Sequence, residues 1–500
     1  MKASTSLCAF ICFVTSSYVL VVASEGVGGD FNSILELVKP YPLEKHYVTT
    51  KDGYILSLYR IPHGLKTTGT HTGTHFSGQL ITAAAGRKVL RPEATDSGGS
   101  ASASDDGDVG EETSRKPVVL LQHGLLDSCA GFLLAGHDSA LAFLLVEAGF
   151  DVWLGNSRGS TYSRAHVTYP ITSREFWTFS FDEMAAFDLP ATLSYIRSHT
   201  GVHRLHYVGH SQGNTLLLAA LSPTMADKIS FVQASEGAAE GTHTAEPFSA
   251  ESQALSRSVA DSLGLVVMLA PVATAKFVTS VPLQAMAAVG TDALFALMGI
   301  HEFLPSLEVA SWLYGGLCTV RPELCVSILA AICGYRKHAV NETRLPLYLR
   351  YTPAGSSVHN MAHWAQAVRG GKNPAHPKFS MFDYGKDCGL WATQGTCNQR
   401  KYGALDPPTY KLGSIPSSVR LALFTGGADI LADPTDTKLL LEDLPPENVV
   451  SSTHLPDYEH LDFIWGMDAP QRVYVPVLKM LLKEQQKMEA GDGESGHLHG

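Results

Sequence analysis

The stretch LHYVGHSQGNTLLLAA, residues 205–220, contains a G-x-S-x-G pattern centred on Ser211. This pattern often surrounds a nucleophilic serine. The chain contains a second example, GNSRG at 155–159, centred on Ser157. From average glycine and serine usage, a chain of this length would show on the order of 0.2 such patterns by chance, so the pattern alone is weak evidence. The residues around each serine must therefore distinguish the two.

The surroundings of Ser211 predict a strand, a sharp turn and a helix. An apolar strand precedes the serine, and the apolar segment NTLLLAALS (214–222) follows it with helical character. Such a turn lifts the serine hydroxyl out of a sheet and directs a helix N-terminus at the site. The flanking glycines are needed because the turn leaves no room for side chains. After Ser157 the chain reads STYSRAHVTYP, with no helical apolar period and a proline at its end. We therefore predict Ser211 as the nucleophile and exclude Ser157.

Strand-like and helix-like segments alternate along the rest of the chain. This alternation predicts right-handed crossovers and a largely parallel sheet, in which the chemistry lies at the carboxyl ends of the strands. The fold class is thus α/β, and Pro190 predicts a kink in its helix. We expect a hairpin over 46–60, strands at 117–122, 150–155, 205–209, 263–271, 420–426 and 448–455, and helices at 138–149, 182–199 and from about residue 470.

A serine nucleophile needs a base, usually histidine, oriented by a carboxylate. In sheets of this type the order along the chain is serine, acid, histidine. Asp429 follows the strand RLALFTG directly and is the predicted acid, with Asp433 as its rival further from the strand end. His460 lies in the loop after the last strand and is the predicted base. Its rival His454 lies on or against that strand, where a structural role is expected.

The negative charge that develops on the attacked carbonyl needs two main-chain N–H donors. The first should be Gln212, directly after the nucleophile. The second should come from the loop after an early strand. The segment QHGLLDS (122–128) follows the strand PVVLL, and Leu125 is the predicted donor, with His123 and Gly124 shaping the turn.

Composition excludes several classes of function. The chain has 500 residues, 45% of them hydrophobic, and a formal net charge of −11. This charge argues against nucleic acid as a partner, because phosphate binding needs a basic surface. The sequence contains no GxxxxGK[ST] phosphate-binding loop and no CxxC pair. Histidines 71, 75 and 243 lie in polar loop-like segments and are interpreted as solvated side chains. We expect neither a cofactor nor a metal.

The N-terminal residues 1–24 have the pattern of a secretory signal peptide: Lys2, an apolar run, then Val-Val-Ala. The alternative is a membrane anchor, which the short and Ser/Thr-rich run disfavours. A secretory destination agrees with the glycosylation sequon at Asn341. Local spacing suggests the disulfides Cys325–Cys333 and Cys388–Cys397, although sequence cannot choose among the 15 pairings that six cysteines allow. The six cysteines beyond the signal are Cys129, Cys318, Cys325, Cys333, Cys388 and Cys397.

Polar, low-complexity composition predicts flexible insertions at 66–116 and 233–260 and a disordered tail at 489–500. Residues 277–334 are apolar, with few charges. They form either an ordinary core helix pair or a lid over the site, and both can hold at once.

Taken with these residues, the sequence resembles the acid lipase family of α/β-hydrolases, which includes gastric and lysosomal acid lipases. The resemblance runs in order through most of 40–475 and includes LLQHGLLDSC, DVWLGNSRGSTYSRAHVTY, HYVGHSQGNT, LFTGGADILADPTD and YEHLDFIWG. It implies an α/β-hydrolase fold with a core of residues 25–271 and 371–488 and a helical cap at about 272–370. Such a cap would cover an acyl pocket and offer apolar surface to a lipid droplet. It also implies Ser211, Asp429 and His460 as catalytic residues, Leu125 and Gln212 as oxyanion donors, and GNSRG as a structural element.

The resemblance implies long-chain acyl esters as substrates, either triacylglycerols or steryl esters, presented at a droplet or micelle surface. We therefore expect a serine ester hydrolase that is secreted or lysosomal. The alternatives are another carboxylic ester hydrolase or acyltransferase, and a catalytically inactive lipid-binding protein on a hydrolase fold. The intact serine, aspartate and histidine argue against the last.

Overall fold

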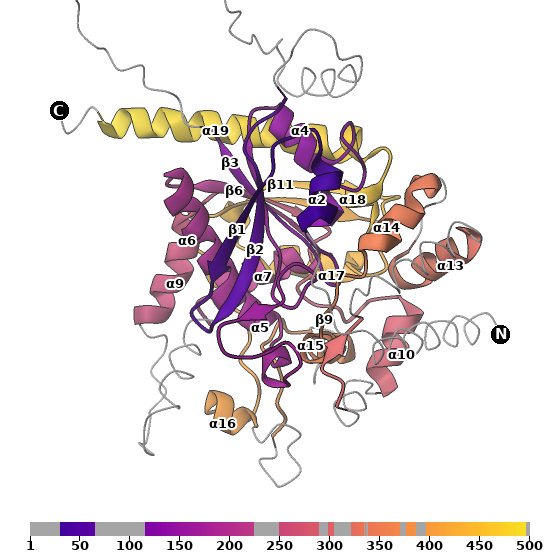
Figure 1. The fold of residues 1–500 in the computed structure, drawn as a ribbon. Coiled ribbons are helices and arrows are strands. Elements are labelled where there is room, and N and C mark those ends of the chain that lie inside the picture. The colour runs from indigo at the N-terminus through magenta and orange to yellow at the C-terminus, as the bar shows by residue number, and fades with distance from the viewer. Residues whose placement is uncertain are drawn as a thin grey trace, which may run out of the picture.

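The computed structural model describes residues 31–65, 116–224, 250–289, 299–304, 322–334, 336, 339–370, 377–386 and 397–496. A nine-stranded sheet forms its centre (Figure 1), with the strand order β1-β2-β4-β3-β6-β7-β10-β11 and β5 paired to β2. The strands of this sheet are β1 Glu44–Thr49, β2 Tyr54–Ile61, β3 Val118–Gln122, β4 Asp151–Leu154, β5 Ala165–His166, β6 Leu205–His210, β7 Leu263–Leu269, β10 Arg420–Gly426 and β11 Val449–Leu455.

The six strands from β4 to β11 are mutually parallel, whereas β1, β2 and β5 pair in antiparallel fashion at one side. The predicted hairpin and all six predicted strands are confirmed within one or two residues at each end. Because parallel strands must be joined by crossovers, the connections run through helices on the two faces of the sheet.

The helices of the core are α2 Phe31–Val38, α4 Leu141–Glu147, α5 Phe181–Glu183, α6 Leu189–Thr200, α7 Gln212–Leu221, α9 Ala250–Asp261, α16 Asn398–Tyr402, α17 Pro434–Asp443, α18 Asp462–Trp465 and α19 Val475–Gly496. Short 3-10 turns lie at Cys129–Phe132, Glu175–Trp177, Leu412–Ser414 and Pro446–Asn448, and π turns at Met184–Asp188 and Pro470–Tyr474. Between β7 and α16 the structure describes α10 Val281–Val289, β8 Glu302–Phe303, α13 Pro322–Cys333, the 3-10 turn Glu342–Arg344, α14 Leu345–Tyr351, β9 Ser356–Ser357 and α15 Val358–Arg369.

Both faces of the sheet are buried, and successive residues of a strand contribute to opposite cores. In β3, Val119 and Leu121 join one hydrophobic cluster, whereas Val118 and Leu120 join the other. The first cluster lies under α2, α4, α18 and α19, and the second under α5, α6, α7, α9 and α17. This two-sided burial explains why the strands read as continuous apolar runs.

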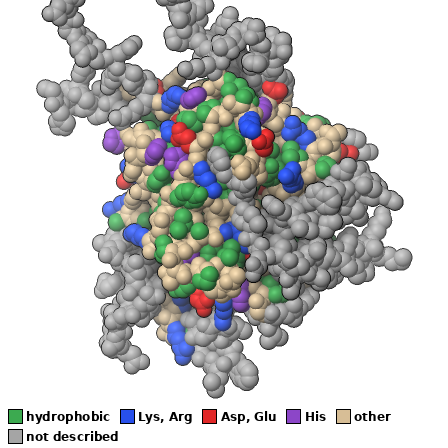
Figure 2. All heavy atoms as spheres, in the orientation of Figure 1, with side chains coloured by type: hydrophobic (Ala, Val, Ile, Leu, Met, Phe, Trp, Pro, Cys, Tyr) green, Lys and Arg blue, Asp and Glu red, His purple; other side chains and the backbone are tan. Residues whose placement is uncertain are grey.

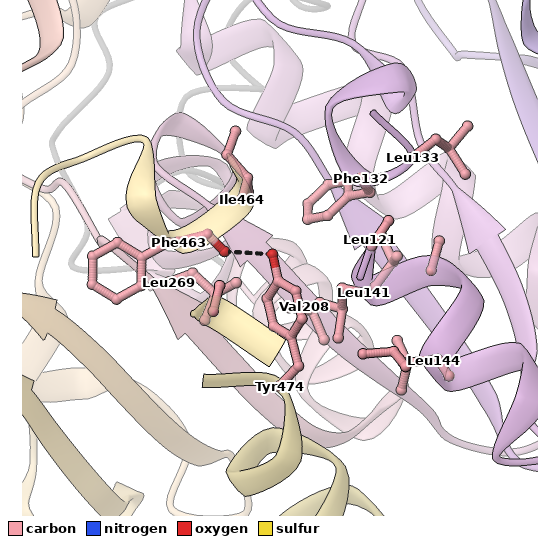
Figure 3. Close-up of a cluster of buried hydrophobic side chains, with 14 of the residues drawn as sticks. Leu121, Phe132, Leu133, Leu141, Leu144, Val208, Leu269, Phe463, Ile464 and Tyr474 are labelled. Carbon is pink, nitrogen blue, oxygen red and sulfur yellow. Dashed lines mark hydrogen bonds between the residues drawn. The ribbon is translucent and has the colours of Figure 1, made fainter. Parts of the chain in front are cut away.

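Part of the first cluster is drawn in Figure 3. Leu121, Val208 and Leu269 come from the adjacent strands β3, β6 and β7. Tyr474 reaches into the same cluster, and its hydroxyl donates a hydrogen bond to the carbonyl of Phe463 at 2.9 Å. The π turn before α19 is thereby joined to α18, which follows the last strand.

The predicted kink at Pro190 is replaced by a π turn. Helix α5, the π turn Met184–Asp188 and α6 follow one another without a break, and Pro190 lies in the first turn of α6. There its missing N–H removes no hydrogen bond of α6 itself, so the proline is accommodated at the start of the helix.

Two predicted disordered segments are partly helical. Residues 250–260 of the expected insertion 233–260 form most of α9, where Val259 and Ala260 are buried and the Ser256 hydroxyl donates to the Leu221 carbonyl at 2.6 Å. Residues 489–496 of the expected tail continue α19. Composition was misleading here because a few apolar residues at helical spacing are enough to dock a largely polar helix. The signal peptide, residues 66–115, residues 233–249 and residues 497–500 lie outside the described residues.

The free thiol of Cys333 contradicts the suggested Cys325–Cys333 disulfide. Cys397 is disulfide-bonded, and its suggested partner Cys388 lies outside the described residues. Over the face drawn in Figure 2, acidic, basic and hydrophobic side chains are interspersed.

Candidate active site

Ser211 lies on the sharp turn between β6 and α7. Its backbone has φ 52° and ψ −122°, a conformation that non-glycine residues rarely adopt. Two hydrogen bonds hold it there: the Ser211 N–H donates to the Leu269 carbonyl at 3.0 Å, and the Asn214 N–H donates to the Ser211 carbonyl at 2.9 Å. The Asn214 side chain also donates to the Leu269 carbonyl, at 2.9 Å. The turn is therefore anchored to the end of the neighbouring strand β7.

The glycines around Ser211 are required by close contacts, as predicted. A Cβ atom on Gly209 would collide with the side-chain oxygen of Asn214, and one on Gly213 would collide with the main-chain carbonyl of Gln122. The second collision is with backbone, which cannot move aside without disrupting β3. The first turn of α7 is thus pressed against the end of β3.

The loop after β3 passes directly over Ser211. A Cβ on Gly124 would lie 2.8 Å from the Ser211 Cβ, so only glycine fits. The preceding His123 accepts the Ser157 N–H at Nε2 (3.1 Å), and its Nδ1 donates to the Gly124 carbonyl at 2.8 Å. Burial lowers the pKa of His123 to about 4, so its ring is neutral. The close approach of Gly124 brings the loop that carries Leu125 next to Ser211, and Gln212 follows Ser211 directly in the chain.

Ser157 is buried within the scaffold. Its hydroxyl accepts a hydrogen bond from the Gln122 side chain at 3.0 Å, and its N–H is bound to His123. These bonds join the loops that follow β3 and β4. Ser157 therefore braces the loop that covers Ser211, and no hydrogen bond among the described residues joins its hydroxyl to a histidine.

The arginine of GNSRG is fully buried and doubly paired. Arg158 bonds Asp188 through Nε at 2.8 Å and Asp52 through a terminal nitrogen at 2.5 Å. Its guanidinium also lies 3.9 Å from the centre of the Tyr54 ring. Asp52 belongs to the β1–β2 turn and Asp188 to the π turn, so this cation joins three separate segments.

Asp429 and His460 are brought together at the same edge of the sheet. The His460 Nδ1 lies 2.9 Å and 3.1 Å from the two carboxylate oxygens of Asp429. One of these oxygens also accepts the N–H groups of Leu431 and Ala432, each at 2.8 Å. Both side chains are buried. The carboxylate is thus fixed by the loop after β10 and holds one nitrogen of the imidazole.

His210, the residue before Ser211, contacts the histidine loop. Its Nε2 donates to the His460 carbonyl at 3.1 Å, and the two rings lie 5.0 Å apart. Burial, reinforced by His460, lowers the pKa of His210 to about 3. Its ring is therefore neutral and places no charge beside an imidazolium at His460. The role of His210 was not anticipated from the sequence, although the residue lies inside the GHSQG motif.

The two rival residues have other partners. Asp433 caps α17, with its carboxylate accepting the Thr435 N–H at 2.7 Å. His454 lies on β11, and its Nδ1 is 3.0 Å from the Thr425 hydroxyl. Neither contacts the Asp429–His460 pair in any hydrogen bond of the described residues.

Glu459, directly before His460, was also missed by sequence reasoning. Among the described residues, one of its carboxylate oxygens is buried without a hydrogen-bond partner. It packs tightly against Gly334, next to the free thiol of Cys333. Burial, followed by the charges of Asp429 and Asp462, raises the pKa of Glu459 to about 7. A second carboxyl group therefore lies beside the acid that holds His460.

An ion cluster fixes the same loop from outside. Arg336 donates to Asp462 at 3.0 Å, to Asp457 at 2.9 Å and to Asp468 at 2.6 Å. The guanidinium groups of Arg336 and Arg472 both lie over the Tyr458 ring, 4.7 and 4.6 Å from its centre. The segment after α13 is thereby joined to the histidine loop.

Within the described part of the chain, one group of side chains has metal-like spacing. Glu44, His46 and His199 offer ligand atoms within 4.8 Å of one another. Arg60 already lies among them, 2.9 Å from the Glu44 carboxylate and 3.4 Å from the His199 ring. Two further bonds to Asp151 hold this guanidinium in place, so the group is accounted for as an ion-pair network. None of the helices within the described residues has the length and apolarity needed to cross a membrane.

Comparison with known proteins gives matches along most of the chain. Residues 38–136 match a family model described as a partial α/β-hydrolase lipase region, and residues 117–266 match the α/β hydrolase fold. Gastric triacylglycerol lipase of Rattus norvegicus is 36% identical over 448 residues, which cover 89% of each chain. Lysosomal acid lipase/cholesteryl ester hydrolase of Homo sapiens is 34% identical over 490 residues, covering 95% of this chain and 99% of the relative.

Proposed function

Since this chain belongs to the family of gastric and lysosomal acid lipases, we propose that it hydrolyses long-chain acyl esters, either triacylglycerols or steryl esters, through an acyl-enzyme on Ser211. The two relatives are named for these two ester classes, and their similarity to the chain is nearly equal. The head group is therefore left open between them. The reaction class, carboxylic ester hydrolysis, is common to both.

His460 serves as the base in this proposal. Asp429 engages Nδ1, so Nε2 is the nitrogen left for the serine hydroxyl. As Ser211 attacks the ester carbonyl, His460 takes its proton and then passes it to the leaving alcohol. Water, activated by the same imidazole, releases the fatty acid and restores the serine. Asp429 stabilises the imidazolium that forms in each half of the reaction.

The N–H groups of Gln212 and Leu125 are the proposed donors to the oxyanion. Gln212 is the first residue of α7, where N–H groups have no partner within the helix. The partial positive charge of the helix N-terminus adds to this stabilisation. The close approach of Gly124 to Ser211 supports the second donor, because it carries the Leu125 peptide to the same place.

We also infer that the enzyme acts at a lipid surface in the secretory pathway or the lysosome, by analogy with relatives described as gastric and lysosomal. Immunolocalisation of the full chain, with and without residues 1–24, would test the compartment. Persistent cytosolic localisation of the full chain would contradict it.

The observation that carries the proposed activity is the carboxylate–imidazole pair at 2.9 Å at the sheet edge that also bears the strained serine. The test combines a fluorophosphonate probe with hydrolysis of emulsified triacylglycerols and cholesteryl esters. We expect the probe to label Ser211 and free fatty acid to be released. An unlabelled protein would be an inactive lipid-binding homologue, and acyl transfer to an added alcohol without free acid would indicate an acyltransferase.

A further inference from the structure

The side chain of Gln212 is held by two donors from a distant helix. Its amide oxygen accepts the Asn360 side-chain N–H at 3.0 Å and the Trp364 indole N–H at 2.6 Å. Both donors come from α15, one helical turn apart. Gln212 and Asn360 are buried, and Trp364 is half-buried. Figure 1 shows α15 close to β9 and α5 at one end of the sheet.

The other end of the same amide is also bound. Its nitrogen donates to the thioether sulfur of Met184 at 3.6 Å. Met184 begins the π turn between α5 and α6, and π turns occur frequently at functional sites. Because every polar atom of the Gln212 amide has a partner, the side chain has one defined position.

The two donors are themselves held by further contacts. The Asn360 N–H donates to the Ser357 hydroxyl at 2.9 Å, and its side-chain nitrogen also reaches the Ser356 hydroxyl at 3.1 Å. Trp364 packs against the hydrophobic clusters on both faces of the sheet and lies 5.3 Å from the Phe181 ring. The anchor is thus built into the protein core.

The orientation of the Gln212 N–H depends on this anchor for a geometric reason. The peptide between Ser211 and Gln212 follows a backbone angle pair that is intrinsically unfavourable. The Asn214 N–H already holds the carbonyl of this peptide, and the anchored Gln212 side chain adds a second constraint. Loss of the anchor would leave the N–H freer to rotate. A displacement of about 1 Å at a catalytic group can lower turnover by roughly 100-fold.

We propose that Asn360 and Trp364 are positioning residues that hold the Gln212 peptide in the orientation needed to stabilise the oxyanion; this role rests on the proposed function of Gln212. They act through the Gln212 side chain and touch no reacting atom. A purely structural role, by contrast, would stabilise the fold without changing the rate at which Ser211 forms its tetrahedral adduct.

The experiment compares Trp364→Phe with Trp177→Phe in the full-length protein. Both substitutions keep an aromatic ring and remove one indole hydrogen bond, and the bond of Trp177 goes to the Ile171 carbonyl at 2.7 Å, outside the site. The measurements are kcat and KM on a soluble short-chain ester and the second-order rate of Ser211 phosphonylation by an activated phosphonate. We expect Trp364→Phe to lower kcat and the phosphonylation rate by about 10-fold with KM unchanged, since a lost donor costs 10²–10³-fold and this donor is only misaligned. Trp177→Phe should leave both rates unchanged.

A second substitution breaks the same side-chain link from the other partner, and the two can be combined. Gln212→Met keeps the backbone N–H and removes the amide, so it should show the same 10-fold loss. The double variant Gln212→Met/Trp364→Phe should lose no further activity, because both substitutions remove the same hydrogen bond between the Gln212 amide and the Trp364 indole. Wild-type rates in Trp364→Phe, or a loss that persists undiminished in the Gln212→Met background, would overturn the positioning role. Failure of the wild-type protein to be phosphonylated on Ser211 would instead contradict the proposed function.

Discussion

The His210 ring donates a hydrogen bond to the main-chain carbonyl of His460 at 3.1 Å. The residue before the proposed nucleophile therefore holds the backbone of the proposed base. Because the carbonyl can only accept, the proton of His210 must lie on Nε2. The link connects the end of β6 directly to the loop after β11, although β7 and β10 lie between these strands in the sheet. The relative position of serine and histidine thus does not depend on the sheet alone.

Alanine substitution of the two serines in the G-x-S-x-G patterns should have different effects on turnover. Ser211→Ala should lower ester hydrolysis by roughly 10⁴–10⁶-fold, leaving the rate due to binding and the oxyanion donors. Ser157→Ala removes the acceptor of the Gln122 side chain and should cost about 1 kcal/mol of stability with most turnover kept. Turnover and thermal melting of both variants provide the test. An inactive but folded Ser157 variant beside an active Ser211 variant would reverse the assignment.

Substitutions of Asp429 and of Asp433 should affect different properties, the first turnover and the second stability. Asp429→Asn loses control of the imidazole tautomer and should lower turnover by about 10³–10⁴-fold with the fold retained. Asp433→Asn should cost about 1 kcal/mol or less, since asparagine also caps helices well. Melting temperature and kcat are measured for both. If Asp433→Asn abolished activity while Asp429→Asn retained it, the acid would have been misassigned.

Glu459 should make stability depend on pH. Its pKa rises from an ordinary 4.5 to about 7 in the folded protein, through burial and the charges of Asp429 and Asp462, with His460 acting in the opposite direction. Between these two values the folded state binds more protons than the unfolded state, so the contribution of this group to stability falls as pH rises and is lowest above pH 7.

The variant Glu459→Gln removes this titration. Its melting temperature relative to wild type should therefore be higher at pH 8 than at pH 4.5. Glu447→Gln changes an exposed carboxylate on the surface and serves as the control. If the difference in melting temperature between Glu459→Gln and wild type stayed constant from pH 4.5 to pH 8, titration of Glu459 would be excluded.

The ion cluster around Arg336 should stabilise the histidine loop. Arg336→Gln leaves Asp462, which is 2% exposed, without its guanidinium partner. We expect a loss of about 2 kcal/mol in the free energy of unfolding, measured by urea titration. Lys438→Gln, which breaks an exposed pair with Glu442 at 3.9 Å, should cost no more than about 0.5 kcal/mol. Equal losses for the two variants would show that the cluster is no more than a surface pair.

The sequence predicted the sheet well because both of its faces are buried. Strands such as β3 and β7 are buried along their whole length, and their apolar runs end at Gln122-His123-Gly124 and near Pro271 respectively. The approximate places of Ser211, Asp429 and His460 followed in the same way from the ends of β6, β10 and β11. Helix α9 was not predicted because it is mostly polar and docks through a few residues, a feature that only the packed structure reveals.

The supporting contacts of the site could not be predicted in the same way. Asn360 lies 148 residues from Gln212 along the chain, and nothing in the local pattern of either residue indicates the other. The same holds for the segment of Arg336 and the histidine loop. These contacts depend on how the elements between β7 and β10 pack, and apolar composition alone does not specify that packing.

The burial of Arg158 has a consequence for how the molecule unfolds. Its charge is neutralised by Asp52 of the N-terminal hairpin and by Asp188, 106 and 30 residues away respectively. If the hairpin detached alone, half of this compensation would be lost and a cation would be left poorly paired in the core, at a cost of about 3–5 kcal/mol. Local opening of the hairpin is therefore disfavoured, and the N-terminal strands should exchange their amide hydrogens together with the central sheet as one cooperative unit.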